Sequence, residues 1–576
     1  MKNYKKLILT GTGLICATAA MAQTQPKDST LNRTVVVENQ YNPEVMDAFK
    51  VNVLPKVEEP AVAKQHIDYA TSLFPLTQYA FEPMGVITRD VRQNGARRGY
   101  LRGAYGNLNN TDIKAAYLWN MTDRDQLDVV GSFYGHSGDV DFPNTEIENN
   151  QRFFRTDFSL DYTHSFSKVK FNLGGSFGSQ VFNYIPVAWD MESKVNKEEA
   201  EGTGISRNQH FVLGEGHLGF ASVKGALPLD FAVQVGFRGF KRMHPVLNMY
   251  GEETEKNVHT QGFVGASLGD EQQVGVGFAM DNLFYADEDE VKNSSVDDSR
   301  VPNENFTLVQ LNPYYTVQKE DLAIRLGAHV DFQTANGSGL KVSPDVNLTY
   351  TFQDAYSLYV QATGGTQLNG FRHLNEFTPY WYTLNQQKTT YTVFDGQAGF
   401  KASPVSGLGL KLYGGYRMTK DDLFVNLISS DIAETFVAPL AQEKSKVAYF
   451  GAGIEYAYRD WFDLGINGQY NNWKLDDDEN IKYLILKPEY TLNVSARAKV
   501  YKGIQVLADY TYENRKKVSG KRLEAVNNLQ LGAEYNYNDR ANVFVLVNNL
   551  LNQTYLTETA YPVLGLNVMA GISVNF

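Results

Sequence analysis

The chain has 576 residues, 13% of them aromatic, and a formal net charge of -12 at neutral pH. Its mean hydropathy is -0.35, and no run of about 18 apolar residues follows the N-terminal leader, so the sequence predicts no transmembrane helix. The acidic balance argues against nucleic-acid binding, because a phosphate-binding surface is basic. The one cysteine, Cys16, lies in the leader, so we expect neither disulfides nor thiolate metal sites in the mature chain.

Residues 1–22 have the pattern of a cleaved signal peptide. Three lysines within the first six residues form a positive n-region, and Leu7 to Ala20 is a mostly apolar stretch. Ala20-Met21-Ala22 is a small-x-small cleavage site. The apolar stretch is too short for an anchor helix, so export with cleavage is the prediction.

Residues 23–97 are predicted to be extended and irregular, because they are rich in proline and show little alternation. Within them, Thr34-Val35-Val36-Val37-Glu38 is a short β-prone run. An exposed strand of this kind can add to the edge of a partner's sheet. A strand packed on the chain's own fold is the alternative. We expect the segment to be periplasmic or to fill the lumen of the domain that follows.

The C-terminal residues show strict alternation of apolar and small or polar side chains. Successive side chains of a strand point to opposite faces, so one face of this stretch can meet lipid and the other a wet lumen. The apolar set is Leu564, Leu566, Val568, Ala570, Ile572, Val574 and Phe576.

The same alternation recurs upstream, and one predicted strand shows which face meets lipid and which faces the lumen. In residues 490–500, Arg497 and Lys499 share a face opposite a run of apolar side chains. A basic residue on the lipid face costs about 2–4 kcal/mol near the bilayer midplane, so both must face the inside.

The connections between the alternating runs differ in length at the two ends. Counting from Gly99 gives about 22 strands, with short turns after even-numbered strands and mostly long loops after odd-numbered ones. This is the arrangement of periplasmic turns and extracellular loops in an outer-membrane barrel. The prediction is therefore an all-β, antiparallel, up-and-down transmembrane barrel over residues 98–576, located in the outer membrane. A secreted β-sandwich is the weaker alternative, because it has no reason to sort loops by parity.

The stretch from Val547 to Tyr555, with the sequence VNNLLNQTY, resembles the signature near the end of TonB-dependent receptor barrels. The resemblance covers roughly residues 99–576 and implies a 22-strand barrel. It also implies that the terminal aromatic, Phe576, is the signal that the barrel-assembly machinery reads. The strands rich in tyrosine and asparagine look like Bacteroidetes versions of the family.

The sequence departs from that family before the barrel. Only about 75 residues separate the signal peptide from the first strand, which is too few for the usual plug. Residues Thr34-Val35-Val36-Val37-Glu38 look like a TonB box, the segment that the energising periplasmic protein pulls on. Because a barrel of this size has a lumen that is normally plugged, we expect residues 23–97, in-folded loops, or a separate plug or lipoprotein partner to fill it.

Three loops carry candidate binding chemistry. Residues 287–290 and 476–479 are acidic runs that suit Ca²⁺ or a solvated loop, and neither has EF-hand spacing. The loop from Thr366 to Tyr391 combines aromatic side chains with a cation, which suits a sugar, haem or peptide ligand, but packing of the loop into the barrel mouth is the alternative. Its candidate ligand residues are Phe371, Arg372, His373, Tyr380, Trp381 and Tyr382.

No catalytic motif is present, and we predict neither an enzyme nor a cofactor. The nine histidines include no HExxH or HxH pair, although His could meet Asp or Ser across strands. The predicted function is uptake or binding of an extracellular ligand by a barrel of the TonB-dependent type. The alternatives are a structural or adhesive surface barrel, a subunit of an outer-membrane complex without transport, and, least favoured, a barrel enzyme.

Overall fold

The structure is a computed structural model that describes residues 98–140, 150–185, 208–244, 253–285, 303–337, 339–383, 386–426, 438–518, 520 and 522–576. The predicted signal peptide and the N-terminal segment, including residues 34–38, lie outside the described residues, as does the acidic run 287–290.

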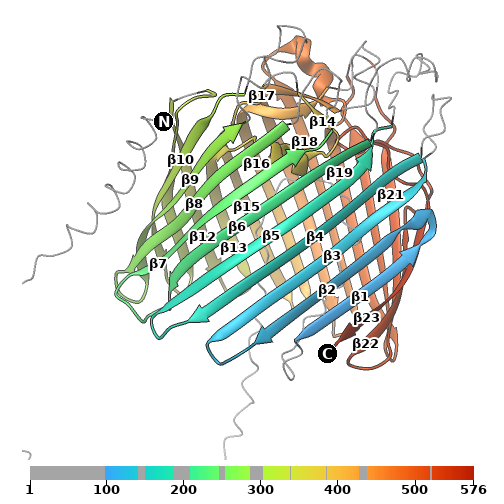
Figure 1. Ribbon diagram of the computed structural model, residues 1–576, viewed down its shortest axis with the longest axis horizontal. Coiled ribbons are helices and arrows are strands. Elements are labelled where there is room, and N and C mark those ends of the chain that lie inside the picture. Colours follow the sequence, from blue (N-terminus) through green and yellow to red (C-terminus); the bar gives the residue numbers. More distant parts are fainter. Residues whose placement is uncertain are drawn as a thin grey trace, which may run out of the picture. The chain divides into compact units, whose positions relative to one another are not determined.

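The described residues form a closed barrel of 22 antiparallel strands, which confirms the predicted fold (Figure 1). Each strand pairs with its neighbours in sequence, and β1 pairs with β23 to close the ring. The first eleven barrel strands are β1 (Gly99–Gly106), β2 (Thr111–Asn120), β3 (Asp125–Asp139), β4 (Asn150–Ser165), β5 (Val169–Asn183), β6 (Asn208–Ser222), β7 (Asp230–Arg242), β8 (Glu253–Ser267), β9 (Gln272–Tyr285), β10 (Phe306–Gln318) and β11 (Leu322–Gln333). The other eleven are β12 (Gly339–Phe352), β13 (Tyr356–Gln367), β15 (Thr390–Val405), β16 (Leu408–Val425), β17 (Ala438–Tyr458), β18 (Phe462–Leu475), β19 (Pro488–Tyr501), β20 (Ile504–Arg515), β21 (Val526–Asn536), β22 (Ala541–Asn548) and β23 (Asn567–Asn575).

Within the described residues, four short elements lie outside the barrel wall. They are η1 (Asn107–Asn109), α4 (Phe371–Phe377), the two-residue strand β14 (Trp381–Tyr382) and η3 (Asp478–Leu484). β14 pairs in parallel with the first residues of β17, so it is not a member of the ring. No helix among the described residues has the length and apolar character needed to cross a membrane.

The seam of the barrel closes through the terminal residue. The Phe576 carbonyl accepts the backbone N–H groups of Arg98 (2.9 Å) and Gly99 (2.8 Å). A side chain at Gly99 would overlap the Phe576 ring, which lies 6.2 Å from the ring of Tyr117. Closure satisfies the backbone groups that an open edge would leave unpaired in lipid. The role of Phe576 as an assembly signal stays a prediction.

The two faces of the wall follow the predicted alternation. Large apolar side chains such as Phe177, Leu412 and Phe450 are exposed on the outside. Arg497 pairs in register with Leu507 of β20. The same face of β20 continues to Arg515, which donates to the Leu556 carbonyl of a loop inside the barrel. The prediction that Arg497 faces the lumen is therefore consistent with the register.

Connection length is sorted by barrel end, as predicted. The short turns after β2, β4, β8, β10, β12, β19 and β21 all lie at the end where β23 finishes, the lower end in Figure 1. Longer connections, such as those after β13, β18 and β22, lie at the opposite end. We take the first end as periplasmic and the second as extracellular.

The assignment of the outer face of β5 to lipid predicts how a charged side chain on either face changes the stability of the barrel. Phe177 is 50% exposed near the middle of β5, and its neighbour Ser176 faces the lumen. We expect Phe177→Arg to lower the free energy of unfolding by at least about 2–4 kcal/mol, and Ser176→Arg to leave it nearly unchanged. Urea unfolding of the protein folded in lipid vesicles measures both, and equal losses would contradict the assignment.

Candidate functional site

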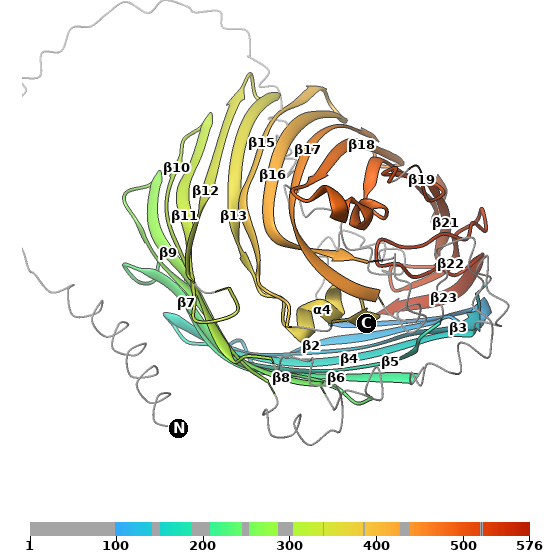
Figure 2. The same cartoon turned by 90° about the horizontal axis from the view of Figure 1, so that it is seen from above.

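The connection between β13 and β15 folds into the barrel instead of standing above it, as Figure 2 shows for α4. Trp381 is 0% exposed and Tyr380 is 4% exposed, and Phe371 and Tyr382 are also buried. Of the two alternatives drawn from the sequence, packing into the barrel mouth therefore describes these aromatic side chains. Arg372 and His373 remain partly exposed, and a role for the loop in ligand binding stays a prediction.

The first turn of α4 is capped by the barrel wall. The Glu255 carboxylate, on β8, accepts the backbone N–H groups of Phe371 (2.6 Å) and Arg372 (3.5 Å). These are amides that the helix itself leaves unpaired. A Cβ at Gly370 would lie 2.5 Å from the same carboxylate. Glycine at this position therefore lets the Glu255 carboxylate approach the first turn of α4.

Charged side chains then hold the helix against the neighbouring strands. Arg372 donates to Glu215 of β6 (2.8 Å), and Arg238 of β7 contacts the same carboxylate (3.2 Å). His373 lies 3.9 Å from Glu376, one turn along α4. The nearby His373 imidazole lowers the pKa of Glu376, with a smaller contribution from the Arg372 guanidinium.

Beyond α4, aromatic stacking joins two loops that are far apart in sequence. The rings of Tyr380 and Tyr561 lie parallel, with centroids 3.3 Å apart. The Tyr380 hydroxyl accepts a hydrogen bond from Gln151 of β4 (3.2 Å). Arg242 of β7 lies 4.0 Å above the Trp381 ring and donates to the Trp381 carbonyl (3.2 Å). Its charge is paired with Glu253 at 3.2 Å, as a buried cation requires.

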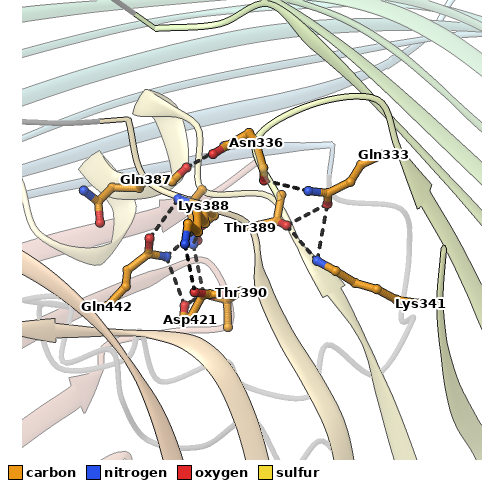
Figure 3. A network of polar contacts seen from close by, with 10 residues as sticks. Gln333, Asn336, Lys341, Gln387, Lys388, Thr389, Thr390, Asp421 and Gln442 are labelled. Atoms are coloured by element: carbon orange, nitrogen blue, oxygen red, sulfur yellow. Dashed lines mark hydrogen bonds and ion pairs between the residues drawn. The ribbon is translucent and has the colours of Figure 1, made fainter. Parts of the chain in front are cut away.

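A polar network, shown in Figure 3, fixes the end of the β13–β15 loop where the chain returns to the barrel wall. The Gln442 side-chain amide accepts a hydrogen bond from the Lys388 N–H (2.8 Å) and donates one to the Lys388 carbonyl (2.7 Å). It thus satisfies both backbone groups of Lys388, as a neighbouring strand would. Thr389 donates to Gln333 (2.7 Å) and accepts a hydrogen bond from Lys341 (3.1 Å). The loop is therefore anchored at both ends.

The connection between β22 and β23 also folds inward, and it contains the VNNLLNQTY motif. Asn549 and Asn552 adopt positive φ angles of 47° and 48°. The Asn549 side chain donates to the carbonyls of Gln553 (2.9 Å) and Leu564 (3.0 Å), while Asn552 accepts the Leu566 N–H (2.7 Å). The motif asparagines thus shape the loop that carries Tyr561. The sequence identified the motif but not this role.

Four charged side chains are buried where this loop meets β20 and the β18–β19 connection. Lys487 lies 3.6 Å from Glu558, and Arg515 lies 3.9 Å from Glu513. Burial raises the pKa of Glu558 to about 7, although the Lys487 ammonium acts in the opposite direction. An ionised Glu558 is therefore unfavourable in the docked loop.

The structure describes only part of the acidic run 476–479. Asp476 forms ion pairs with Lys444 and Lys446, so its charge is neutralised within the protein. Among the described residues there is no group of three or more His, Cys, Asp or Glu side chains placed to hold a metal ion.

Histidines do meet Ser or Asp across strands, as the sequence left open. His210 lies 3.0 Å from the Ser179 hydroxyl, His217 lies 3.1 Å from Asp161, and His259 lies 2.7 Å from Asp281. In the part of the chain that the structure describes, none of these three histidines links a serine to a carboxylate. The His217 and His259 contacts belong to the lumen wall, whereas His210 and Ser179 lie on the outer face, which they share with the exposed Val181.

A closed barrel with an apolar outer surface and a polar wall inside is an outer-membrane β-barrel. Three of the solved structures that the chain resembles are the following. The ferric enterobactin receptor PfeA of Pseudomonas aeruginosa has a TM-score of 0.63 at 12% identity, covering 84% of this chain and 81% of that one. The FrpB iron transporter of Neisseria meningitidis has a TM-score of 0.64 at 10% identity, covering 84% and 82%. FpvA of P. aeruginosa, solved with heterologous pyoverdines, has a TM-score of 0.59 at 12% identity, covering 83% and 71%.

No protein-family model and no curated protein matches the sequence. At these identities the likeness to the solved structures concerns the fold, and it agrees with the 22-strand barrel expected from the sequence.

The hydrogen bonds from the first turn of α4 to Glu255 predict what releases the β13–β15 loop from the barrel wall. Gly370→Ala places a methyl group against Glu255, and losing the capped amides costs about 1–3 kcal/mol. We expect more frequent open events in planar-bilayer recordings of this variant. Gly239→Ala is the control, because its Cβ would meet nothing within 4 Å. Recordings of Gly370→Ala identical to wild type would contradict the anchoring role.

The raised pKa of Glu558 predicts that docking of the β22–β23 loop depends on pH. Its pKa rises from 4.5 to about 7 on docking, so docking is tightest at acid pH and weakens as pH rises through 7. Hydrogen–deuterium exchange of residues 549–566, corrected for the intrinsic rate, should show this loss of protection. Glu558→Gln should remove the dependence, and the exposed Glu524→Gln should keep it. An unchanged pH profile in Glu558→Gln would disprove the assignment.

Proposed function

We propose that the chain is a receptor that binds an extracellular ligand and takes it up through the barrel with energy supplied by TonB. The observation that carries the proposal is the closed 22-strand barrel, which resembles TonB-dependent siderophore receptors over 84% of the chain. The ligands named for those receptors are theirs.

The in-folded loops support an energised mechanism. The β13–β15 and β22–β23 loops share a buried hydrophobic cluster inside the barrel, and both are anchored to the wall by charged side chains. Widening the mouth by displacing part of this cluster would expose its apolar surface, which is unfavourable. A pulling partner in the periplasm can supply that free energy.

The segment Thr34-Val35-Val36-Val37-Glu38 is the proposed contact with TonB. An extended run of β-branched residues suits strand addition, in which main-chain hydrogen bonds supply the affinity. We further propose that residues 1–22 are removed on export, that residues 23–97 or a separate lipoprotein complete the obstruction of the lumen, and that Phe576 is read by the barrel-assembly machinery. The tyrosine-rich strands suggest a Bacteroidetes source.

A surface barrel that conducts nothing is the second candidate. It is favoured by one observation, namely that the chain's own loops pack into a buried cluster in the mouth. Such a barrel would act as an adhesive surface or as a subunit of an outer-membrane complex. It requires no contact with TonB, and this difference separates the two candidates.

Photo-crosslinking in living cells tests the proposal. A photoreactive residue at position 36 should give an adduct with TonB, and one at position 53 is the control in the same segment. Val36→Pro with the probe at position 35 should abolish the adduct, because proline lacks the N–H that strand addition uses. Absence of any adduct from residues 34–38, in cells where an authentic TonB-dependent receptor gives one, would favour the second candidate.

A further inference from the structure

Three lysine side chains lie together on the outer face of β17 and β18, near the extracellular end of the barrel. Lys446 lies four residues from the exposed Phe450 on β17, and Lys474 lies four residues from the exposed Tyr470 on β18. Because an even number of residues along a strand keeps side chains on one face, both lysines point away from the lumen. Lys444 follows on the same face, and the three side chains form what we call the outer lysine cluster.

The outer lysine cluster contains an unfavourable contact between like charges. Lys446 and Lys474 lie directly opposite each other in the antiparallel ladder. The Cβ atoms of such a pair are about 4.5–5.5 Å apart, and like charges there destabilise the sheet. Asp476 pairs with Lys444 and lies 2.6 Å from Lys446, whereas Lys474 forms no ion pair with any described residue. Three ammonium groups therefore face one carboxylate, which leaves an excess of two positive charges.

The next carboxylate along the chain does not reduce this excess. Asp477 lies beside Glu443, because Asn480 donates hydrogen bonds to both carboxylates, at 3.3 Å and 2.7 Å. Glu443 shares its face of β17 with the buried Ser445, which is the face that points into the barrel. The charge of Asp477 is therefore on the lumen side of the wall.

Strand length gives the height of the cluster in the membrane. β17 and β18 meet at the periplasmic end, where Tyr458 pairs with Phe462. Lys446 is 12 residues from Tyr458, and Lys474 is 12 residues from Phe462. A strand tilted by about 40° climbs roughly 2.5 Å per residue, so the lysines lie about 30 Å above the periplasmic end. The apolar band of such barrels is about 25 Å tall, so the ammonium groups lie just beyond the hydrocarbon.

Exposed aromatic side chains mark the same boundaries. Tyr456, Tyr458 and Trp461 are exposed at the periplasmic end of β17 and β18. Tyr416 and Tyr470 are exposed between the lysines and the middle of the wall. Aromatic girdles stand at the two interfaces of an outer-membrane barrel. The outer lysine cluster therefore lies in the headgroup layer of the outer leaflet.

A phosphate monoester matches the cluster in charge and in hydrogen bonding. It carries a charge of about -1.5 to -2 at pH 7 and has three acceptor oxygens, to which ammonium groups donate charge-assisted hydrogen bonds. A phosphodiester or a carboxylate carries a single negative charge and would leave part of the excess unbalanced. We propose that the outer lysine cluster binds the phosphate monoester of an outer-leaflet lipid of the lipid A type. This goes beyond the proposed uptake function and does not depend on TonB.

Native mass spectrometry of the full-length protein in a neutral detergent tests the binding. The probes are monophosphoryl lipid A, lipid A without its phosphates, and the phosphodiester lipid phosphatidylglycerol. We expect monophosphoryl lipid A to bind at least about tenfold more tightly than either comparison lipid. Equal binding of the phosphate-free lipid would overturn the proposal. If inorganic phosphate displaces the lipid at equal concentration, the cluster binds the free ion and the lipid assignment is wrong.

Three variants locate the phosphate. Lys474→Gln removes the ammonium group that has no ion pair and should weaken binding of monophosphoryl lipid A by about tenfold or more, whereas Lys474→Arg keeps the charge and should retain binding. Lys319→Gln, at the periplasmic end, removes an exposed lysine of the same charge and is the matched control. Unchanged binding in Lys474→Gln, or an equal loss in Lys319→Gln, would contradict the location.

Thermal unfolding in the same detergent separates lipid binding from a structural role of Lys474. Without lipid, Lys474→Gln relieves the repulsion from Lys446, so its unfolding midpoint should equal or exceed that of the wild type. Adding monophosphoryl lipid A should raise the midpoint of the wild type, because a ligand of the folded state stabilises it, and should raise that of the variant less. If the lipid raises both midpoints equally, the outer lysine cluster is not its binding site.

Discussion

The hydrogen bonding of the backbone in a medium without water is the constraint on which the rest of this structure depends. A strand in hydrocarbon cannot leave its N–H and C=O groups unpaired, and a ring of strands is the arrangement that leaves no edge. Here the ring closes between β1 and β23, and the terminal Phe576 completes the seam with its own carbonyl. The alternation of side chains follows, because one face of every strand meets lipid and the other meets the lumen.

Closure of 22 strands creates a second requirement, since a ring of this size encloses a wide lumen. The chain meets part of it with its own loops. The β13–β15 and β22–β23 connections fold inward and stack through Tyr380 and Tyr561, and wall residues such as Glu255 and Arg242 hold them in place. The polar wall that suits a wet lumen thus also supplies the anchors of the obstruction.

The sequence predicted the barrel because its determinants are local. Alternation is read over ten residues, and the short turns stand between neighbouring strands, so the strand count and the two ends followed directly. Arg497 could be assigned to the lumen from its own strand alone. For the loop from Thr366 to Tyr391 the sequence left two alternatives, and it did not show that the β22–β23 loop folds inward, because the residues that these loops contact are remote in sequence. Phe371 is held by Glu255, 116 residues earlier, and Tyr561 contacts Ile185 across 376 residues.

The contact between Tyr380 and Tyr561 tests the central claim, that the chain's own loops meet inside the lumen. The mature chain is expected to have no cysteine, so a Tyr380→Cys, Tyr561→Cys pair is free of competing thiols. Oxidation or a short bifunctional thiol reagent applied to isolated outer membranes should cross-link the pair, which shifts the unfolded protein on a gel. If the pair stays uncross-linked while both thiols react readily with a bulky reagent added from outside, the loops do not meet in the lumen and the account is wrong.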